Sequence, residues 1–514
     1  MDALLVPLCN ATGASLDQVK LIACLLVSYP LGSVFIRLPR TQPALKHLFN
    51  IAVCTFYFIP MLNLRGGLAQ LWLDVLGTYI IAERVRSPRM PWIVFGLLMS
   101  HLLVNHFARE MSGLGYETFE ITGPQMVLVM KLSTFAWNVH DGRRPISDLD
   151  KWQQKKRVTA YPSLLAFLGY AFYFPGALVG PYLDFASYAA LVDGSIYTSI
   201  ERHHVDKVSR RAVPSGRKRV AYRKLATGLA WLGLYVVYSG KYNYGVGVQD
   251  WFAQKPFLFR FLYWQVCGTM ERSKYYALWM MTEGAAIFTG LGFTGYSLTG
   301  ASQWAGASNV DVLQIEFAPN FKVLLDSWNK NTNVWLRECV YKRVTPKGKK
   351  PGFRSSMMTF GTSALWHGIS PGYYLSFLFG GFVTTLGRLC RSHIRPLLLP
   401  APRSLLKTVY DVLGTVMAVS LCNFATGPFM LGTLPRSFRA WYNLDFYGVV
   451  VVGAGLAFFW SGGGEKLKAV QARRVGTAAA AVQAKGEDGT TTSYQVPSVD
   501  VGVKEVEARV RRQN

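Results

Sequence analysis

The chain is organised around residues 328–377, where two polar side chains stand among long apolar runs. Residues 328–344 read WNKNTNVWLRECVYKRV and residues 363–377 read SALWHGISPGYYLSF, so that Asn329 lies in the first run and His367 in the second. A histidine in apolar surroundings costs free energy unless it is paired or lines a wet cavity, so an ionisable group there marks a functional site. We therefore expect His367 to carry the chemistry.

The composition indicates that the chain folds in a membrane. Hydrophobic residues make up 51% of the sequence and charged residues 16%, and the mean hydropathy is +0.19. Apolar stretches near the ~20 residues that cross a bilayer recur from end to end, which predicts an all-α polytopic membrane protein. Several stretches are too short or too broken to cross alone, so we expect a pocket inside the membrane. The candidate spans are residues 19–36, 45–63, 67–82, 91–107, 124–138, 160–181, 225–245, 257–266, 275–295, 355–366, 371–389, 405–430 and 446–461.

The positive charge of the chain lies in its loops. There are 55 lysine and arginine residues against 29 aspartate and glutamate residues, which gives a formal net charge of +26. Cations that flank apolar spans set membrane topology and attract anionic lipid, so they do not indicate a nucleic-acid-binding protein. A basic membrane surface also attracts an anionic soluble substrate.

The charge pattern predicts a topology. The early loops alternate in charge, which places the N-terminus and the Asn10 glycosylation sequon in the lumen. Three later loops are all basic, with six lysines and arginines in residues 141–157, nine in residues 201–224 and seven in residues 337–354. If all three are cytosolic, the Pro- and Gly-rich segment 160–181 enters and leaves the membrane on one side. The alternative is that one basic loop is lumenal.

The seven cysteines are scattered singly, without a C-x-x-C pair or a cluster with histidine at metal-ligand spacing. Most lie in or near apolar segments, where a free cysteine behaves as a small hydrophobic residue. We expect neither a structural disulfide nor a bound metal. An alternative role for Cys339 is that of a thioester nucleophile, with only Arg337 and Lys342 nearby to lower its pKa. The cysteines are Cys9, Cys24, Cys54, Cys267, Cys339, Cys390 and Cys422.

The sequence predicts two parts of the chain. Residues 1–462 form a membrane-embedded domain, and from residue 463 the sequence becomes polar, small and charged with almost no aromatic residues. Such a composition cannot bury enough apolar surface to become ordered. We expect residues 463–514 to be a basic, disordered cytosolic tail, with transient helix near residues 466–474.

His367 stands at a predicted break between two helices. The run Ser355–Trp366 is apolar or small and favours a packed helix, whereas Gly368 gives backbone freedom and Pro371 suits the first turn of the next helix. His367 would then face a cavity, where a neutral imidazole, with a pKa of about 6.5, can accept a proton from an alcohol. The alternative is a histidine that only hydrogen-bonds to a neighbouring helix.

Asn329 lies between two tryptophans, Trp328 and Trp335, that share a face if the segment is helical. An amide side chain can orient an imidazole or donate a hydrogen bond to a developing oxyanion. Three asparagines within residues 329–333 can equally cap a helix at the membrane interface. The spacing alone does not decide between these roles.

Two further polar tracts interrupt apolar sequence. Trp279 and Glu283 are four residues apart on one predicted helical face, and a buried Glu283 needs a cation such as Arg272 or Lys274. Glu283 can therefore line a site or form a structural ion pair. Residues 137–145, WNVHDGRRP, are predicted to be a structural polar turn.

These tracts resemble the membrane-bound O-acyltransferase family in its lysophospholipid acyltransferase branch. Residues 366–373 are similar to the histidine motif of that branch, and residues 328–336 are similar to its asparagine motif. Motifs for soluble acyltransfer and nucleotide-binding sites, such as G-x-S-x-G and the P-loop, are absent. Other stretches that resemble the branch are residues 137–142, 162–165, 179–181 and 272–283.

The resemblance implies a helical membrane bundle of about 11 transmembrane helices, with re-entrant or broken segments around a catalytic chamber. The chamber would open to the cytosol for acyl-CoA and to the bilayer for lipid. His367 matches the catalytic histidine of the family and Asn329 matches its partner. No metal or cofactor is implied. Residues expected around the substrates are Tyr276, Trp279, Glu283, Asn333, Trp335, Arg337, Lys342, Trp366 and Tyr373.

The function implied is that of a multi-pass lysophospholipid O-acyltransferase of the endoplasmic reticulum, which acylates the free sn-2 hydroxyl of lysophospholipids from acyl-CoA. Alternatives are another branch of the family, acting on diacylglycerol, a sterol or a protein, or a lipid transporter. Transporters often contain duplicated halves, and no internal repeat is found here. The cations expected at the CoA phosphates are Arg337, Lys342, Arg343, Lys347, Lys349, Lys350 and Arg354.

Overall fold

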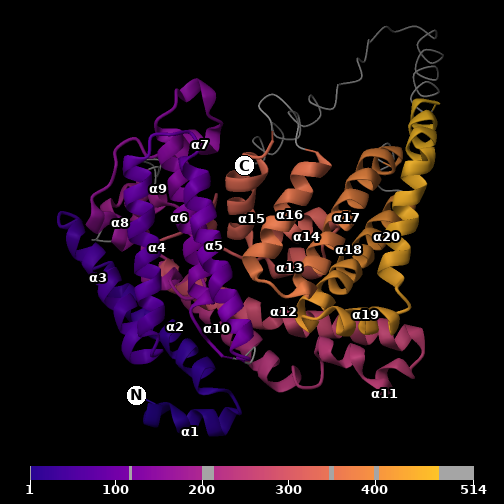
Figure 1. Cartoon of the computed structure of the whole chain (residues 1–514), viewed down its shortest axis with the longest axis horizontal. Helices are drawn as coiled ribbons and strands as arrows, with labels where there is room; N and C mark the ends of the chain where they lie inside the picture. Colours follow the sequence, from indigo (N-terminus) through magenta and orange to yellow (C-terminus); the bar gives the residue numbers. More distant parts are fainter. Residues whose placement is uncertain (1, 115–117, 199–212, 346–351, 399–404, 474–514) are drawn as a thin grey trace.

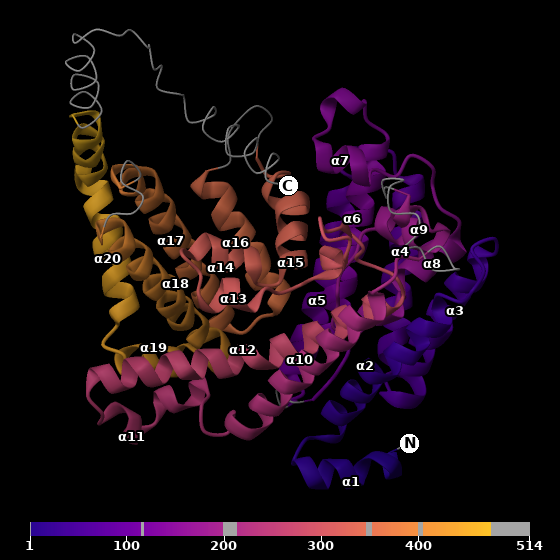
Figure 2. The same ribbon diagram turned by 180° about the vertical axis from the view of Figure 1, so that it is seen from behind.

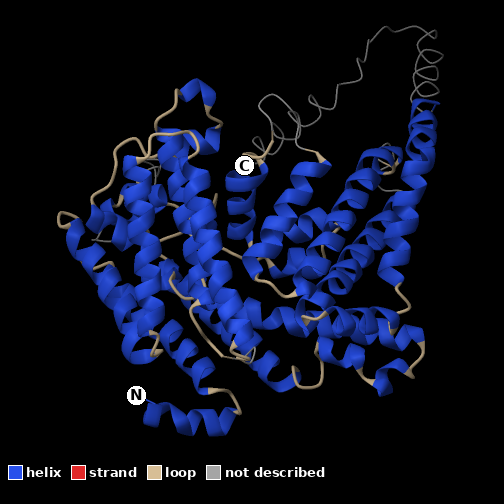
Figure 3. Cartoon of the chain, in the orientation of Figure 1, coloured by secondary structure: helices blue, strands red, loops and turns tan. Residues whose placement is uncertain are grey.

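Helices make up nearly all of the regular structure. The computed structural model describes residues 2–114, 118–198, 213–345, 352–398 and 405–473 (Figure 1). The strands within these ranges form one short antiparallel hairpin of β1 (Gly295–Tyr296) and β2 (Ser302–Gln303), and the remainder is helix and loop (Figure 3). The predicted all-α architecture is confirmed.

The N-terminal helices form one side of the molecule (Figures 1 and 2). Apolar side chains on facing surfaces of these helices pack into one large hydrophobic core. The helices of this side are α1 (Asp2–Thr12), α2 (Leu16–Phe35), α3 (Pro43–Phe56) with η1 (Tyr57–Met61), α4 (Arg65–Arg84), α5 (Met90–Met111), α6 (Thr122–Gly142), α7 (Lys151–Lys156), α8 (Leu164–Ala171), η3 (Phe174–Gly176) and α9 (Phe185–Asp193).

Helix α6 lies in the interior of this side. Seventeen of its 21 residues are buried, and they cover every face of the helix. A helix that is buried all round must find protein partners for each polar side chain that it carries. Lys131 illustrates this, because its amine donates to the carbonyl oxygens of Tyr170 at 2.6 Å and Ala171 at 2.8 Å. These carbonyls belong to the last two residues of α8, beyond the regular hydrogen bonds of the helix.

The segment that contains α8 begins and ends near α7. Helix α8 has eight residues and is therefore about 12 Å long, too short to cross a bilayer. Beyond it, η3 and an irregular stretch lead back towards α7, where Lys156 pairs with Asp184 at 2.6 Å. This ion pair brings together the residues that flank segment 160–181 on its two sides. That the segment enters and leaves the membrane on one side stays a prediction.

A long pair of helices, α10 (Arg217–Tyr238) and α12 (Phe257–Phe288), crosses the base of the molecule between its two sides (Figures 1 and 2). The prediction of separate spans at residues 257–266 and 275–295 is wrong, because α12 is one continuous helix of 32 residues. The charged residues between the two predicted spans form ion pairs within the protein. Arg272 pairs with Glu316 at 2.7 Å, which lets the helix continue through polar sequence.

The C-terminal helices form the other side, and short helices lie between the two sides (Figures 1 and 2). A second hydrophobic core joins α12 to this side. The remaining helices are η6 (Tyr244–Val248), α11 (Asp250–Ala253), α13 (Val312–Glu316), α14 (Phe321–Ser327), α15 (Lys330–Trp335), η8 (Leu336–Tyr341), α16 (Phe353–His367), α17 (Pro371–His393), α18 (Leu405–Leu431), α19 (Leu434–Tyr442), α20 (Tyr447–Phe458) and η10 (Phe459–Gly463).

Five helices in the described part of the chain are long and apolar enough to cross a membrane. The predicted number of about 11 spans therefore stays a prediction. Helical backbone continues past the predicted domain boundary at residue 463 as far as Arg473, with a kink at Gly462. Helix was expected near residues 466–474, and residues 474–514, the rest of the predicted tail, lie outside the described residues, so the boundary at residue 463 stays a prediction.

We predict that Gly372 is required for the close approach of α17 to α18. A Cβ atom at Gly372 would lie 2.1 Å from the carbonyl oxygen of Pro428, whereas one at Gly380 on the same helix would meet nothing closer than 3.8 Å. Overpacking of this kind costs about 1–3 kcal/mol. Gly372→Ala should lower the thermal unfolding temperature in detergent and Gly380→Ala should not. Equal unfolding temperatures for the two variants would contradict the packing described.

Candidate active site

His367 lies at the break predicted from its sequence. Helix α16 ends at His367, and Gly368 follows with a φ of 136°, a backbone conformation that favours glycine. Helix α17 then begins at Pro371, whose missing N–H is not needed in a first turn. Local chemistry thus places a histidine side chain at a gap between two helices.

Aromatic rings surround the half-buried imidazole of His367. The Trp366 and Phe429 rings meet it edge-on with centroids at 4.7 and 4.9 Å, and Phe377 stacks on it at 5.3 Å. Tyr373 lies farther away, at 6.2 Å, and packs against Phe429. Apolar walls of this kind exclude water and strengthen the hydrogen bonds of any polar group inside them.

Two hydrogen bonds fix the backbone and ring next to His367. The Trp366 indole Nε1 donates to the carbonyl oxygen of Met126 on α6 at 3.0 Å. His106 on α5 places its Nε2 3.2 Å from the carbonyl oxygen of Trp366, one of the unpaired carbonyls at the end of α16. The sequence analysis missed His106, although a histidine within a long apolar span was a signal that could have found it.

Asn329 has a left-handed backbone, with φ 44° and ψ 55°, between α14 and α15. Asparagine is one of the few residues that tolerate this conformation. Its Oδ1 accepts hydrogen bonds from Thr332 Oγ1 at 2.8 Å and Asn309 Nδ2 at 3.1 Å. It occupies the cap position of α15 but makes no side-chain cap bond, so it does not act as the helix cap considered as an alternative.

Trp328 and Trp335 do not share a helical face, which corrects that prediction. Trp328 precedes the turn at Asn329 and packs against Trp279, with ring centroids 4.9 Å apart. Trp335 is the last residue of α15 and is fully buried. The left-handed residue between them reverses the direction of the chain. Asn333 holds this turn, since its Nδ2 donates to the Trp328 carbonyl oxygen at 2.8 Å.

Helix α6 brings the two predicted catalytic segments to one surface. Met126, Met130 and Ser133 are spaced i, i+4 and i+7 and therefore lie on one helical face. They bond, in that order, to the Trp366 indole at 3.0 Å, the Thr332 hydroxyl at 3.3 Å and the Trp335 indole at 2.9 Å. Trp366 adjoins His367 and Thr332 bonds to Asn329, so one face of α6 anchors a neighbour of each predicted catalytic residue.

Tyr276 and Trp279 form a separate aromatic wall around Trp328, next to Asn329 in the sequence. The Tyr276 hydroxyl donates to Glu316 at 2.7 Å, and Arg272 pairs with the same carboxylate. Tyr276 therefore supports this wall through an ion-paired network. The sequence analysis missed Glu316, which is an isolated acid beyond the long helix α12.

The counter-ion predicted for Glu283 is wrong. Glu283 is 1% exposed and pairs with Lys224 of α10 at 2.9 Å, whereas Lys274 pairs with Glu271 and Arg272 with Glu316. Helices α10 and α12 pack along their lengths, and this contact was not visible in the sequence. Glu283 is therefore held by an ion pair between helices.

A second group of ion pairs lies where α6 meets the basic segment after α15. Residues 137–142 belong to α6, so the predicted turn starts only after Gly142. Asp141 is fully buried and binds Arg343 through both oxygens, at 2.9 and 2.5 Å, while the guanidinium of Arg343 lies 4.2 Å from the Trp137 ring centroid. Arg343 therefore has a structural partner in Asp141 and is not available to the phosphates of CoA, which it had been expected to bind.

Lys342 and Arg337 lie nearer the surface than Arg343 does. Lys342 bridges Asp150 at 2.7 Å and Glu338 at 2.6 Å, and Arg337 pairs with Glu338 with 53% of its side chain exposed. Burial raises the pKa of the Asp150 carboxyl, but Lys342 and the first amides of α7 outweigh this effect and hold that pKa below its usual value. Residues 347, 349 and 350 lie outside the described residues, and Arg354 is exposed.

Cys339 is unsuited to nucleophilic attack. It is fully buried, and its sulfur lies 3.4 Å from the Thr134 hydroxyl. An apolar environment disfavours the thiolate, which is the reactive form. All seven cysteines are free thiols. Among the described residues, no group of three or more His, Cys, Asp or Glu side chains is placed to hold a metal ion.

The fold and this site define a polytopic helical membrane protein that holds a histidine and an asparagine against one buried helix. The family model of the membrane-bound O-acyltransferases matches residues 89–423, and the chain belongs to that family. It is therefore an O-acyltransferase, as predicted.

Three curated relatives show the extent of the similarity. The chain is 37% identical to a lysophospholipid acyltransferase of Schizosaccharomyces pombe, over 87% of each chain. It is 36% identical to a lysophospholipid acyltransferase of Saccharomyces cerevisiae, over 89% of this chain and 76% of that protein. It is 30% identical to lysophospholipid acyltransferase 6 of Drosophila melanogaster, over 86% of this chain and 60% of that protein.

We predict that Lys224 stabilises the fold by neutralising Glu283. Removing one partner of a buried ion pair costs about 3–5 kcal/mol, and the lower part of that range applies because Lys224 is 23% exposed. Lys224→Met should lower the thermal unfolding temperature in detergent, and adding Glu283→Gln should restore most of the loss. A double variant no more stable than Lys224→Met would show that the charge of Glu283 does not need this partner.

Proposed function

We propose that this protein is a lysophospholipid O-acyltransferase, which transfers a fatty acyl group from acyl-CoA to the free sn-2 hydroxyl of a lysophospholipid. One observation carries the proposal: Trp366, which adjoins His367, and Thr332, which bonds to Asn329, are held on one face of α6 in a chain similar to lysophospholipid acyltransferases. An aromatic enclosure around the histidine suits this reaction, because water would otherwise hydrolyse the thioester.

His367 is the proposed general base. Its imidazole takes the proton from the lysophospholipid hydroxyl as the oxygen attacks the thioester carbonyl carbon. The tetrahedral intermediate collapses with loss of the CoA thiolate, which takes the proton from the imidazolium. The products are the diacyl phospholipid and free CoA thiol, and the histidine returns to its neutral form. The hydrogen bonds at Trp366 support this role by fixing the end of α16.

Asn329 is the proposed partner of His367. Its Oδ1 accepts two hydrogen bonds from Thr332 and Asn309, which orients the amide. Within the described part of the chain its Nδ2 group donates to no protein group, so it is available to a reactant. An amide N–H directed at the carbonyl oxygen would stabilise the charge that develops there.

The substrates are proposed to enter from different sides. Arg337 and Lys342 lie near the surface, at the edge of the molecule that carries α7, and suit the phosphates of CoA. Helix α7 carries Lys151, Lys155 and Lys156, which supports a cytosolic position for this edge. A cytosolic C-terminal tail is also part of the proposal. Residence in the endoplasmic reticulum membrane is part of the proposal. Trp279 and Tyr373, in the two aromatic walls, are proposed to contact the lipid.

We expect His367→Ala to lose activity by about 10²–10⁴-fold, the usual contribution of a general base. The assay uses purified protein in detergent with oleoyl-CoA and a panel of lysophospholipids, and follows the release of free CoA thiol. His393→Ala is the matched control, because His393 lies at the far end of α17 and contacts Ser392 and Leu389. Full activity in His367→Ala would refute its role. No lysolipid-dependent release by the unchanged protein would refute the substrate class.

We expect Asn329→Asp to lose about 10²–10³-fold in kcat, the effect of removing one oxyanion donor. Aspartate keeps the oxygen that Thr332 bonds to and tolerates the left-handed backbone, so the fold should survive. Asn329→Gly removes the side chain while relaxing the backbone and should lose a similar amount. If Asn329→Asp retains its kcat, the amide N–H groups do not act in the reaction.

A further inference from the structure

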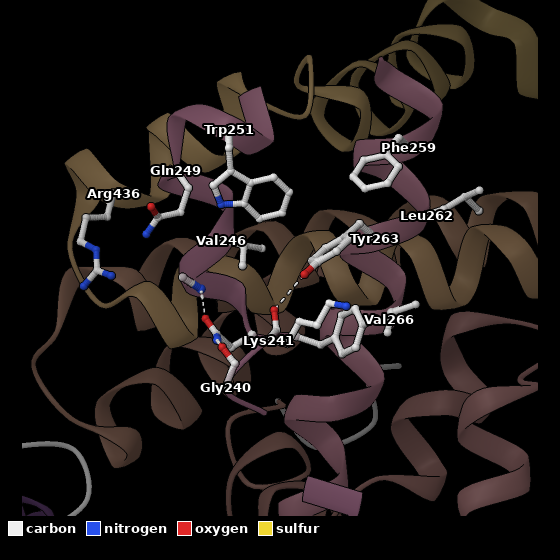
Figure 4. Close-up of a pocket in the computed structure, with 13 residues that line it drawn as sticks. Gly240, Lys241, Val246, Gln249, Trp251, Phe259, Leu262, Tyr263, Val266 and Arg436 are labelled. Atoms are coloured by element: carbon white, nitrogen blue, oxygen red, sulfur yellow. Dashed lines mark hydrogen bonds between the residues drawn. The ribbon is translucent and has the colours of Figure 1, made fainter. Parts of the chain in front are cut away.

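A surface pocket of about 900 Å³ lies at the base of the molecule, and its lining includes neither His367 nor the aromatic rings around it. It is formed by the loop after α10, the short helices η6 and α11, the first turns of α12, and α19. Figure 4 shows the side chains that line it. The last α12 residue that lines the pocket is Val266. It lies 13 residues before Trp279 of the aromatic wall around Trp328, which is about 20 Å along the helix.

The lining changes from polar to apolar across the pocket (Figure 4). Arg436 and Gln249 stand on one side of the view, with the indole of Trp251 between them and the apolar residues. Leu262 and Val266 stand on the opposite side, 54% and 42% exposed. The pocket therefore offers a charged end and an open apolar end.

The apolar end is a continuous helical strip. Phe259, Leu262 and Val266 are spaced i, i+3 and i+7, so they lie on one face of α12, and each is more than 40% exposed. Such a strip on a membrane protein faces acyl chains. Trp251 is 41% exposed at its edge, and tryptophan prefers the level of the lipid head groups.

The charged end carries a cation without an acidic partner. In the described part of the chain Arg436 forms no ion pair with a carboxylate, whereas Arg439, one turn from Arg436, is paired with Asp250 at 2.6 Å. An unpaired guanidinium next to the Gln249 amide is suited to bind a phosphate group, because its planar fork matches two phosphate oxygens.

The loop that forms the pocket floor is rigidly held. Asn243 accepts a hydrogen bond from the Gly245 amide at 2.9 Å, and Tyr244 reaches Thr426 of α18 at 2.8 Å. Asn443 donates to the Gly247 carbonyl oxygen at 2.9 Å, and Tyr263 donates to the Lys241 carbonyl oxygen at the same distance. The pocket is thus built into the fold.

We propose that this pocket binds a membrane glycerophospholipid, with its phosphate on Arg436 and its acyl chains along Phe259, Leu262 and Val266. Helices α11 and α19 lie at the edge of the molecule opposite to α7 (Figures 1 and 2). The lipid is therefore drawn from the leaflet at the edge opposite to α7. This site is separate from the one around His367 and does not rest on the proposed function.

The test measures thermal unfolding of the full chain in detergent as lipid is added. Dioleoylphosphatidylglycerol should raise the unfolding temperature, because a ligand that binds only the folded state stabilises it. Dioleoylglycerol lacks the phosphate and glycerol 3-phosphate lacks the chains, so neither should match that rise. A rise of the same size with dioleoylglycerol would overturn the phosphate contact, and one with glycerol 3-phosphate would overturn the role of the chains.

Two matched variants locate the lipid. Arg436→Gln and Arg439→Gln each remove one positive charge from α19, but only Arg436 lines the pocket. Arg436→Gln should weaken phosphatidylglycerol binding about tenfold or more, which is the effect of losing a charge-assisted hydrogen bond. Arg439→Gln should bind as the unchanged protein does. Equal binding by the two variants would place the lipid elsewhere, for example around His367, and would overturn the proposal.

Discussion

The structure depends on one constraint of the bilayer: every backbone polar group that a broken helix leaves unpaired must find a partner inside the protein. Helix α6 provides several of these partners. Its Lys131 amine binds the last two carbonyls of α8, and its Asn138 carbonyl accepts from the Val158 amide at 2.9 Å. Without these bonds the breaks on either side of α8 would leave backbone groups with fewer partners inside the protein.

The same helix gives the site its rigidity. The hydrogen bonds from Trp366, Thr332 and Trp335 to α6 hold α15 and the end of α16 in place. A buried hydrogen bond in a region of low dielectric is strong and costly to leave unmade, so these segments have little freedom to shift. Catalysis by a fixed base and a fixed hydrogen-bond donor benefits from this rigidity, because the groups need not reorganise during the reaction.

The aromatic residues divide the interior into two walls. One wall is centred on Trp328 and belongs to α12, and the other surrounds His367 and belongs to α16, α17 and α18. The turn at Asn329 lies between them in sequence and connects α14 to α15. The Arg272–Glu316 ion pair anchors the first wall. The hydrogen bond from the Trp366 indole to Met126 anchors the second, so both walls are fixed by polar contacts. The phospholipid pocket at the base uses neither wall.

Local features were predictable from the sequence. The break after His367 follows from Gly368 and Pro371, which act on their own backbone whatever surrounds them. The membrane class follows from apolar length and charge, each a property of a short stretch. The re-entrant course of residues 160–181, argued from charge and the Pro–Gly breaks, stays a prediction. The family resemblance identified His367 and Asn329, whose catalytic roles stay predictions.

Contacts between distant segments were decided only by the tertiary structure. The partner of Glu283 is Lys224, 59 residues earlier in the chain, because α10 and α12 pack together, and no local pattern records that choice. Only the hydrogen bonds in the structure identified three further residues as neighbours of the site, namely His106, Asn309 and Glu316. The sequence by itself determined the membrane class and the helix break at His367, since both depend on the chemistry of short stretches. Tertiary structure decided which residues meet, since partner choice depends on helix packing.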